Sequence, residues 1–136
     1  MKKPVLGITM GDAAGIGAEI TIKACTDPKL YEKARPVVYG DAKVLKRAAE
    51  ILHSKVQIHV ISSPKEAAPS VDRLEVIDLN CIPENFEYGK IQPECGKGSY
   101  LFIERAVKDA LNHDIHAIVT APLNKEALHL GGCNHP

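Results

Sequence analysis

Residues 4–20 read PVLGITMGDAAGIGAEI, and this stretch decides the fold. Its first part, Pro4–Met10, is a continuous apolar run with the length of a short buried strand. A turn punctuated by glycines follows over Gly11–Gly17, and a segment with helical character begins at Ala18. A buried strand that passes through a tight turn into a helix is typical of a parallel α/β sheet.

The same alternation continues along the chain. Further strands are expected at residues 36–39, 56–61, 74–79 and 115–120, and further helices at residues 42–52, 99–112 and 124–130. Asp41 is the expected N-cap of the second helix, and Asp27-Pro28 is expected to end the first. Because most of these strands are continuous apolar runs, the sequence predicts an α/β fold with three α/β/α layers and a mostly parallel sheet.

Two details of this prediction concern the second half of the chain. Residues 80–98 contain two prolines and three glycines and are expected to be irregular, and a loop of that length usually has a function or packs on a neighbouring element. The inner side of the helix at 99–112 is expected to consist of Tyr100, Ile103, Ala106, Val107 and Ala110.

Composition excludes several classes of function. The 136 residues carry 17 basic and 17 acidic side chains, so the chain has no general attraction to nucleic acid or to an anionic membrane. No apolar run approaches the length of a membrane span, and the start of the chain does not resemble a signal peptide. The four cysteines form no C-x-x-C pair, so we expect reduced thiols and a cytoplasmic protein.

The glycine turn admits two interpretations. Gly11, Gly15 and Gly17 have the spacing G-x-x-x-G-x-G, which is neither the dinucleotide fingerprint nor a P-loop. Backbone N–H groups at such a turn often approach a phosphate, but the carboxylates of Asp12 and Glu19 would repel one. The turn is therefore either structural, or it presents its backbone and carboxylates to a substrate hydroxyl or to a nicotinamide.

The segment Thr120–Lys125, TAPLNK, follows the last strand. Asn124 is a plausible N-cap, which places Lys125 in the first helical turn, where its charge opposes the helix dipole. Lys125 is thus either a solvated surface lysine or a point charge that holds a carboxylate or phosphate. Because ligands bind outside the carboxyl ends of parallel strands, this segment and Gly11–Glu19 are expected to lie at one edge of the sheet.

The histidines do not predict a metal site. His113 and His116 are spaced like a chelating pair, but they fall at the edge opposite the expected ligand side. His129 and His135 are nearer the ligand edge, and the chain supplies no further ligands beside them.

Both segments together resemble a known family. Residues 8–20, ITMGDAAGIGAEI, are similar to the opening of the 4-hydroxythreonine-4-phosphate dehydrogenase family of vitamin B6 synthesis. Residues 115–132, IHAIVTAPLNKEALHLGG, resemble its later signature, and Val38–Asp41 also fits. The resemblance covers essentially the whole chain.

The resemblance implies an α/β/α subunit related to isocitrate and isopropylmalate dehydrogenases, which works as a homodimer with its active site in an interdomain cleft at the subunit interface. Such an enzyme uses NAD, in a non-Rossmann site, to oxidise a small phosphorylated β-hydroxy acid, and the product then loses carbon dioxide. A divalent metal (zinc, magnesium or cobalt), held by three histidines from both subunits, polarises the reacting groups.

Carried onto this sequence, the resemblance gives a set of candidate residues for binding substrate or cofactor: Gly11, Asp12, Gly15, Gly17, Glu19, Thr120, Asn124 and Lys125. Ala13 and Ala18 replace prolines of the family, and Cys95–Ser99 departs from its small-residue pattern. The chain ends at Pro136, before the family's Gly-His-Thr-Glu and its metal histidines. We therefore expect residues 1–136 to be the N-terminal part of a two-domain subunit, with no catalytic residue and no metal ligand of their own, and inactive alone.

Two alternatives remain. The sequence PLNKEALHL at residues 122–130 favours a closer similarity to those relatives of the family that act on D-threonate or D-erythronate 4-phosphate in sugar-acid catabolism. From another class, the chain could be an α/β domain that binds a ligand or a partner without chemistry. A thermal shift with NAD plus metal would separate an enzyme from such a domain.

Overall fold

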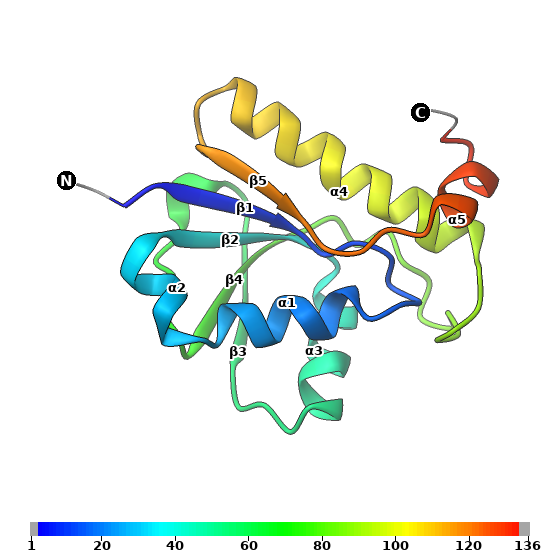
Figure 1. The fold of residues 1–136 in the computed structure, drawn as a ribbon, viewed down its shortest axis with the longest axis horizontal. Helices are drawn as coiled ribbons and strands as arrows, with labels where there is room; N and C mark the ends of the chain where they lie inside the picture. The colour runs from blue at the N-terminus through cyan, green and yellow to red at the C-terminus, as the bar shows by residue number, and fades with distance from the viewer. Residues whose placement is uncertain (1–2, 134–136) are drawn as a thin grey trace.

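The computed structural model describes residues 3–133, and it places five parallel strands in one sheet in the order β3-β4-β2-β1-β5 (Figure 1). The strands are β1 (Val5–Thr9), β2 (Arg35–Gly40), β3 (Gln57–Ile61), β4 (Arg73–Asp78) and β5 (Ala117–Thr120). The predicted α/β fold with a parallel sheet is confirmed.

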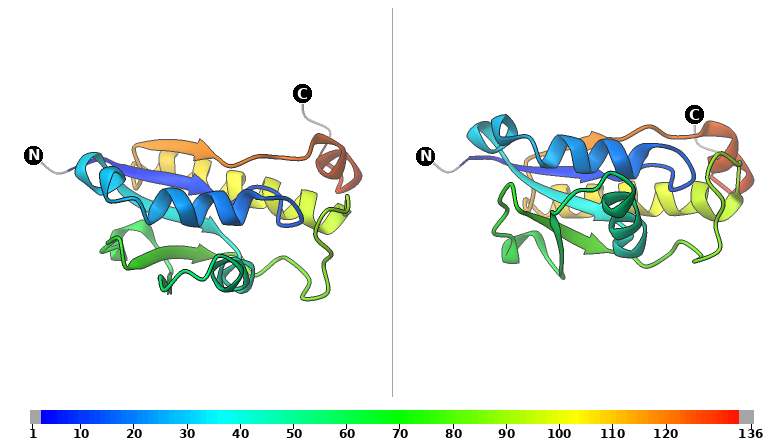
Figure 2. Two further views of the ribbon diagram at one scale, coloured as in Figure 1. Left: turned by 60° about the horizontal axis from the view of Figure 1, so that its bottom comes forward. Right: turned by 90° about the horizontal axis from the view of Figure 1, so that it is seen from below.

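The helices are α1 (Gly17–Cys25), α2 (Pro28–Lys33), α3 (Ala42–Ile51), α4 (Pro93–Leu111) and α5 (Lys125–Leu130), with a short 3-10 turn at Pro64–Glu66. Helices α1 and α3 pack together on one face, and α4 covers β1, β2 and β5 from the other (Figure 2). Right-handed crossovers explain these layers. From β1 to β3 the chain moves toward one edge of the sheet, and from β3 to β5 it moves toward the other edge, so the connecting helices fall on opposite faces.

A buried polar network joins β2 to α4. The Tyr39 hydroxyl donates to Asp109 Oδ2 at 2.8 Å, and Arg105 Nε lies 3.2 Å from both oxygens of that carboxylate. Arg105 Nη2 also donates to the carbonyl of Ser62, at 3.0 Å, in the connection between β3 and β4. Burial, and then the bond to Asp109, raise the pKa of Tyr39 far above its ordinary value. The network therefore fixes α4 against the sheet.

Two helix boundaries differ from the prediction. Asp27-Pro28 does end α1, but it also begins α2, because Asp27 Oδ1 accepts from Lys29 N at 3.0 Å and proline suits the first helical position. Helix α4 begins at Pro93, six residues before the expected start at 99, and so takes in Gly96 and Gly98. Gly96 is needed for packing, since a Cβ there would lie 2.0 Å from the carbonyl oxygen of Ala127, whereas a Cβ at Gly98 would meet the end of the Ile82 side chain at 2.4 Å.

The predicted inner face of α4 is also partly wrong. Ala106 is buried as expected, but Val107 is 41% exposed. The buried side of the helix consists of Cys95, Gly96, Gly98, Ser99, Phe102, Ala106 and Asp109. Apolar periodicity missed Ser99 and Asp109 because both are polar and are buried with hydrogen bonds, from Ser99 Oγ to the carbonyl of Gly96 and from Tyr39 to Asp109. Cys95, Gly96 and Gly98 lie before the expected start of the helix.

Candidate ligand-binding site

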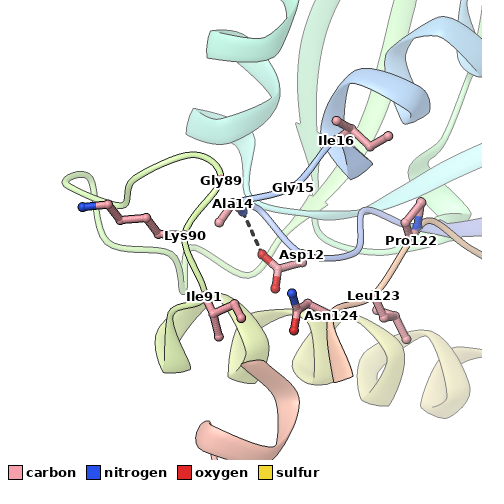
Figure 3. A pocket seen from close by; sticks show the side chains of 10 residues that line it. All are labelled: Asp12, Ala14, Gly15, Ile16, Gly89, Lys90, Ile91, Pro122, Leu123 and Asn124. Carbon is pink, nitrogen blue, oxygen red and sulfur yellow. Dashed lines mark hydrogen bonds between the residues drawn. The ribbon is translucent and has the colours of Figure 1, made fainter. Parts of the chain in front are cut away.

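Strands β1 and β5 are parallel neighbours, and the connections that follow them lead to opposite faces of the sheet. After β1 the chain turns into α1 on one face, and after β5 it reaches α5, which packs on α4 at the other face. This is a topological switch point, where open α/β sheets bind ligands. A cavity of about 240 Å³ opens there (Figure 3). It is lined by Asp12, Ala14, Gly15, Ile16, Gly89, Lys90, Ile91, Pro122, Leu123 and Asn124.

The two motif segments are in direct contact at this edge of the sheet. The backbone N–H of Asp12 donates to the carbonyl of Pro122 at 3.2 Å. Gly11 has φ +79°, and a Cβ there would lie 2.5 Å from the same carbonyl oxygen. A Cβ at Gly17 would lie 2.1 Å from the carbonyl oxygen of Met10. The prediction that both segments share one edge is confirmed. Gly11 allows the close approach of the two segments, and Gly17 allows α1 to start directly against the end of β1.

Asp12 is the buried acid of the cavity, with 5% of its surface exposed. Its Oδ1 accepts from the backbone N–H of Ala14 at 2.8 Å, and its second oxygen points away from that bond (Figure 3). Burial raises the pKa of the Asp12 carboxyl, and the hydrogen bond from Ala14 partly opposes this. One carboxylate oxygen is thus left to accept a hydrogen bond from a ligand.

Asn124 lies opposite Asp12 and is the N-cap of α5, as predicted. Its Oδ1 accepts from the backbone N–H of Ala127 at 2.9 Å. This bond fixes the orientation of the amide, because only the oxygen can accept. The Nδ2 group is left on the other side, where it points toward Asp12 (Figure 3).

Not every candidate residue lines the cavity. Gly15 does so at an exposed position, and a Cβ there would meet only the carbonyl oxygen of Asp12, at 3.6 Å. Glu19 is half-buried in the first turn of α1, and Thr120 is exposed at the end of β5. The Lys125 side chain is exposed and makes no hydrogen bond or ion pair with any other residue in the range 3–133. The binding roles of these residues stay predictions.

A third wall of the cavity was not identified from the sequence. Gly89, Lys90 and Ile91 belong to the connection between β4 and α4, which reaches the glycine turn through a hydrogen bond of 2.8 Å from Gly89 N to the carbonyl of Ala14. Lys90 Nζ pairs with Glu87 Oε2 at 2.5 Å. The length of the irregular stretch was the available signal, but nothing in the sequence specified where it packs.

The histidines lie where the sequence placed them, as far as the structure describes them. His116 Nδ1 accepts from the backbone N–H of Val5 at 2.9 Å, so it lies at the amino end of β1, away from the cavity. His129 is exposed on α5, and His135 lies outside the described residues. Across residues 3–133, no group of three or more His, Cys, Asp or Glu side chains could hold a metal ion.

All four cysteines are free thiols, as expected. Burial raises the pKa of Cys25 to about 12 and that of Cys81 and Cys95 to about 11, which leaves these three thiols protonated and unreactive at neutral pH. Within the described part of the chain, no helix is both long and apolar enough to cross a membrane.

Comparison with known proteins identifies the family. Residues 32–136 match the family described as pyridoxal phosphate biosynthetic protein PdxA. The D-threonate 4-phosphate dehydrogenase of Cupriavidus necator is 42% identical over 133 residues, which are 98% of this chain and 40% of that protein. The chain therefore belongs to the PdxA family, and it spans about two fifths of the length of this relative.

Solved structures agree. A 4-hydroxythreonine-4-phosphate dehydrogenase from Burkholderia phymatum superposes with a TM-score of 0.97 at 44% identity, over 100% of this chain and 41% of that one. The enzyme of the same name from Klebsiella pneumoniae gives 0.92 at 38% identity, over 98% of this chain and 42% of that one. The fold is thus that of the corresponding part of these dehydrogenases.

Proposed function

We propose that residues 1–136 form part of an NAD-dependent dehydrogenase that oxidises a small phosphorylated hydroxy acid, whose product then loses carbon dioxide. The cavity at the switch point carries this proposal, because both family motifs meet there and one buried carboxylate and one amide face into it. The names of the relatives support the substrate class, since they refer to D-threonate 4-phosphate and 4-hydroxythreonine 4-phosphate. We further propose that the whole protein is a cytoplasmic homodimer.

The side chains of the cavity fit a nicotinamide better than a phosphate. Ile16, Ile91 and Leu123 offer apolar surface for an aromatic ring, while the carboxylate of Asp12 would repel a phosphate placed beside it. When bound, NAD would supply the hydride acceptor. This chain would contribute binding and orientation, and its close-packed motif segments would hold the cofactor in one position.

A divalent metal, which the resemblance implies, finds no cluster of three ligands among residues 3–133. We therefore assign no step of this chain to the metal, and propose that its ligands lie elsewhere in the enzyme. For the same reason we propose that residues 1–136 do not turn over substrate alone.

A chimera tests the proposed function. Residues 1–136 replace the matching two fifths of the Cupriavidus necator D-threonate 4-phosphate dehydrogenase, and NAD reduction is measured with D-threonate 4-phosphate and with 4-hydroxythreonine 4-phosphate. We expect turnover of one of these and none by residues 1–136 alone, with the parent enzyme as positive control. A folded, dimeric chimera that binds NAD but oxidises neither compound would contradict the proposal and favour the non-catalytic binding domain.

A further inference from the structure

Apart from Lys90, whose ammonium pairs with Glu87, the polar side chains that line the cavity present one acceptor and one donor to a ligand. Oδ1 of Asp12 is engaged by Ala14 N, so the acceptor is the second carboxylate oxygen. Oδ1 of Asn124 is engaged by Ala127 N, so the donor is the amide NH2 group. The two side chains come from opposite sides of the switch point, and the amide nitrogen of Asn124 is turned toward the Asp12 carboxylate (Figure 3).

A primary carboxamide has the complementary pair of groups. Its NH2 donates and its carbonyl accepts, so it can satisfy a carboxylate oxygen and an amide NH2 at the same time. A carboxylate has no donor for Asp12 and would bring two negative charges together in a site where Asp12 is almost wholly buried. A phosphate meets the same repulsion.

The rest of the lining suits the ring that carries the carboxamide. Ile16 at the start of α1, Ile91 in the β4–α4 connection and Leu123 after β5 are each at least 38% exposed, so their apolar surface is available to a ligand. They come from three separate segments around the cavity (Figure 3).

On these grounds we propose that the cavity binds the nicotinamide carboxamide of the cofactor, with Asp12 accepting from its NH2 group and Asn124 donating to its carbonyl oxygen. This inference rests on the proposed NAD dependence and adds to it the residues that select the amide. Asp12 and Asn124 are then the residues by which the enzyme distinguishes NAD from its deamidated form, nicotinic acid adenine dinucleotide.

The substitution Asp12→Asn tests the inference through a change of preference. The N–H of Ala14 still needs an acceptor, so the new amide oxygen takes that bond and its NH2 group turns into the cavity. The site then presents two donors, which suit a carboxylate. We expect the ratio of the Kd values for NAD and its deamidated form to shift toward the deamidated form by roughly 10- to 150-fold, the value of a hydrogen bond to a charged group.

A second variant, Asn124→Asp, keeps the cap of α5 because a carboxylate also accepts from Ala127 N. It places a second negative charge opposite Asp12, so NAD binding should weaken roughly tenfold or more. The matched control for Asp12→Asn is Asp27→Asn, the same chemical change at an aspartate that also accepts from the backbone N–H two residues on, here Lys29 N, outside the cavity. It should leave both Kd values unchanged.

Both ligands are titrated by calorimetry at pH 8 into the chimera and into residues 1–136 alone, after circular dichroism has shown that each variant is folded. A shifted ratio in Asp12→Asn, with no shift in Asp27→Asn, supports the inference. If the chimera binds NAD and the ratio stays within about twofold of the parent value, the inference fails while the proposed function stands. If the chimera does not bind NAD at all, both fail.

Discussion

Gly11 and Gly89 have almost the same backbone conformation, with φ +79° and +77°, but very different surroundings. A Cβ at Gly11 would lie 2.5 Å from the carbonyl oxygen of Pro122, whereas a Cβ at Gly89 would meet nothing within 4 Å. Gly89→Ala should therefore lower the free energy of unfolding by about 1–2 kcal/mol, through the positive φ alone. Gly11→Ala should cost about 1–3 kcal/mol more, because the two motif segments must separate.

Urea unfolding of the two variants measures this difference directly, since Gly89→Ala serves as the control for backbone strain. Equal losses in the two variants would show that the contact between the motif segments relaxes without cost.

Burial of Asp12 makes a prediction about pH. A carboxyl whose pKa is higher in the folded state than its ordinary value of 3.8 binds protons on folding, so its contribution to stability falls as pH rises through the interval between the two values. Asp12→Asn keeps an acceptor for Ala14 N and removes the buried charge. The variant should unfold at a higher temperature than the parent at about pH 7, and this gain should disappear at about pH 3. A variant that is less stable than the parent at neutral pH would contradict this account.

Lys125 has no structural partner among residues 3–133, so its charge is available for a ligand. If it contacts an anionic group of substrate or cofactor, Lys125→Met in the chimera should lower kcat/KM by roughly 10- to 150-fold and hardly change Tm. Lys46→Met, at another exposed helix position, is the matched control. A change below about twofold would return Lys125 to the solvated-lysine interpretation.

At the scale of elements, the strands could be predicted because most are short apolar runs bounded by turn residues. Helix α2 could not be predicted, because Asp27-Pro28 both ends α1 and begins α2. The start of α4 could not be predicted either, because the glycines in its first turns are explained only by the neighbouring residues that they contact. The site shows the same limit. Asp12 and Asn124 follow from their motifs, whereas the wall at residues 89–91 depends on the tertiary hydrogen bond from Gly89 to Ala14.

Helix α5 is held in place by a close approach to α4, and this predicts an effect at a distance. A Cβ at Gly96 would lie 2.0 Å from the carbonyl oxygen of Ala127, so Gly96→Ala should displace α5 and with it Asn124. We expect a loss of about 1–3 kcal/mol in stability and faster amide hydrogen exchange over residues 125–130, with the strands unaffected. Lys108→Ala, at an exposed position of α4, is the control. Unchanged exchange at α5 would show that the helix tolerates the methyl group.

At the scale of the whole molecule, the edge of the sheet at β5 leaves apolar surface uncovered. Val119 is 48% exposed on this edge strand, and Leu123 after it is 38% exposed. An uncovered apolar edge pairs readily with other chains. Residues 1–136 alone should therefore bind ANS and self-associate, and Val119→Lys should reduce self-association, as measured by sedimentation. A parent chain that is monomeric and binds no ANS would contradict this prediction.

The pairing of β1 with β5 also determines the order in which the sheet can form during synthesis. The ribosome delivers roughly 5–20 residues per second, so β1 waits on the order of 5–20 s before its second partner emerges. Through that interval one edge of β1 has no strand beside it, and the contact between Asp12 and Pro122 cannot form. The nascent chain is therefore most exposed to mispairing early in translation, and its binding cavity is among the last features to be completed.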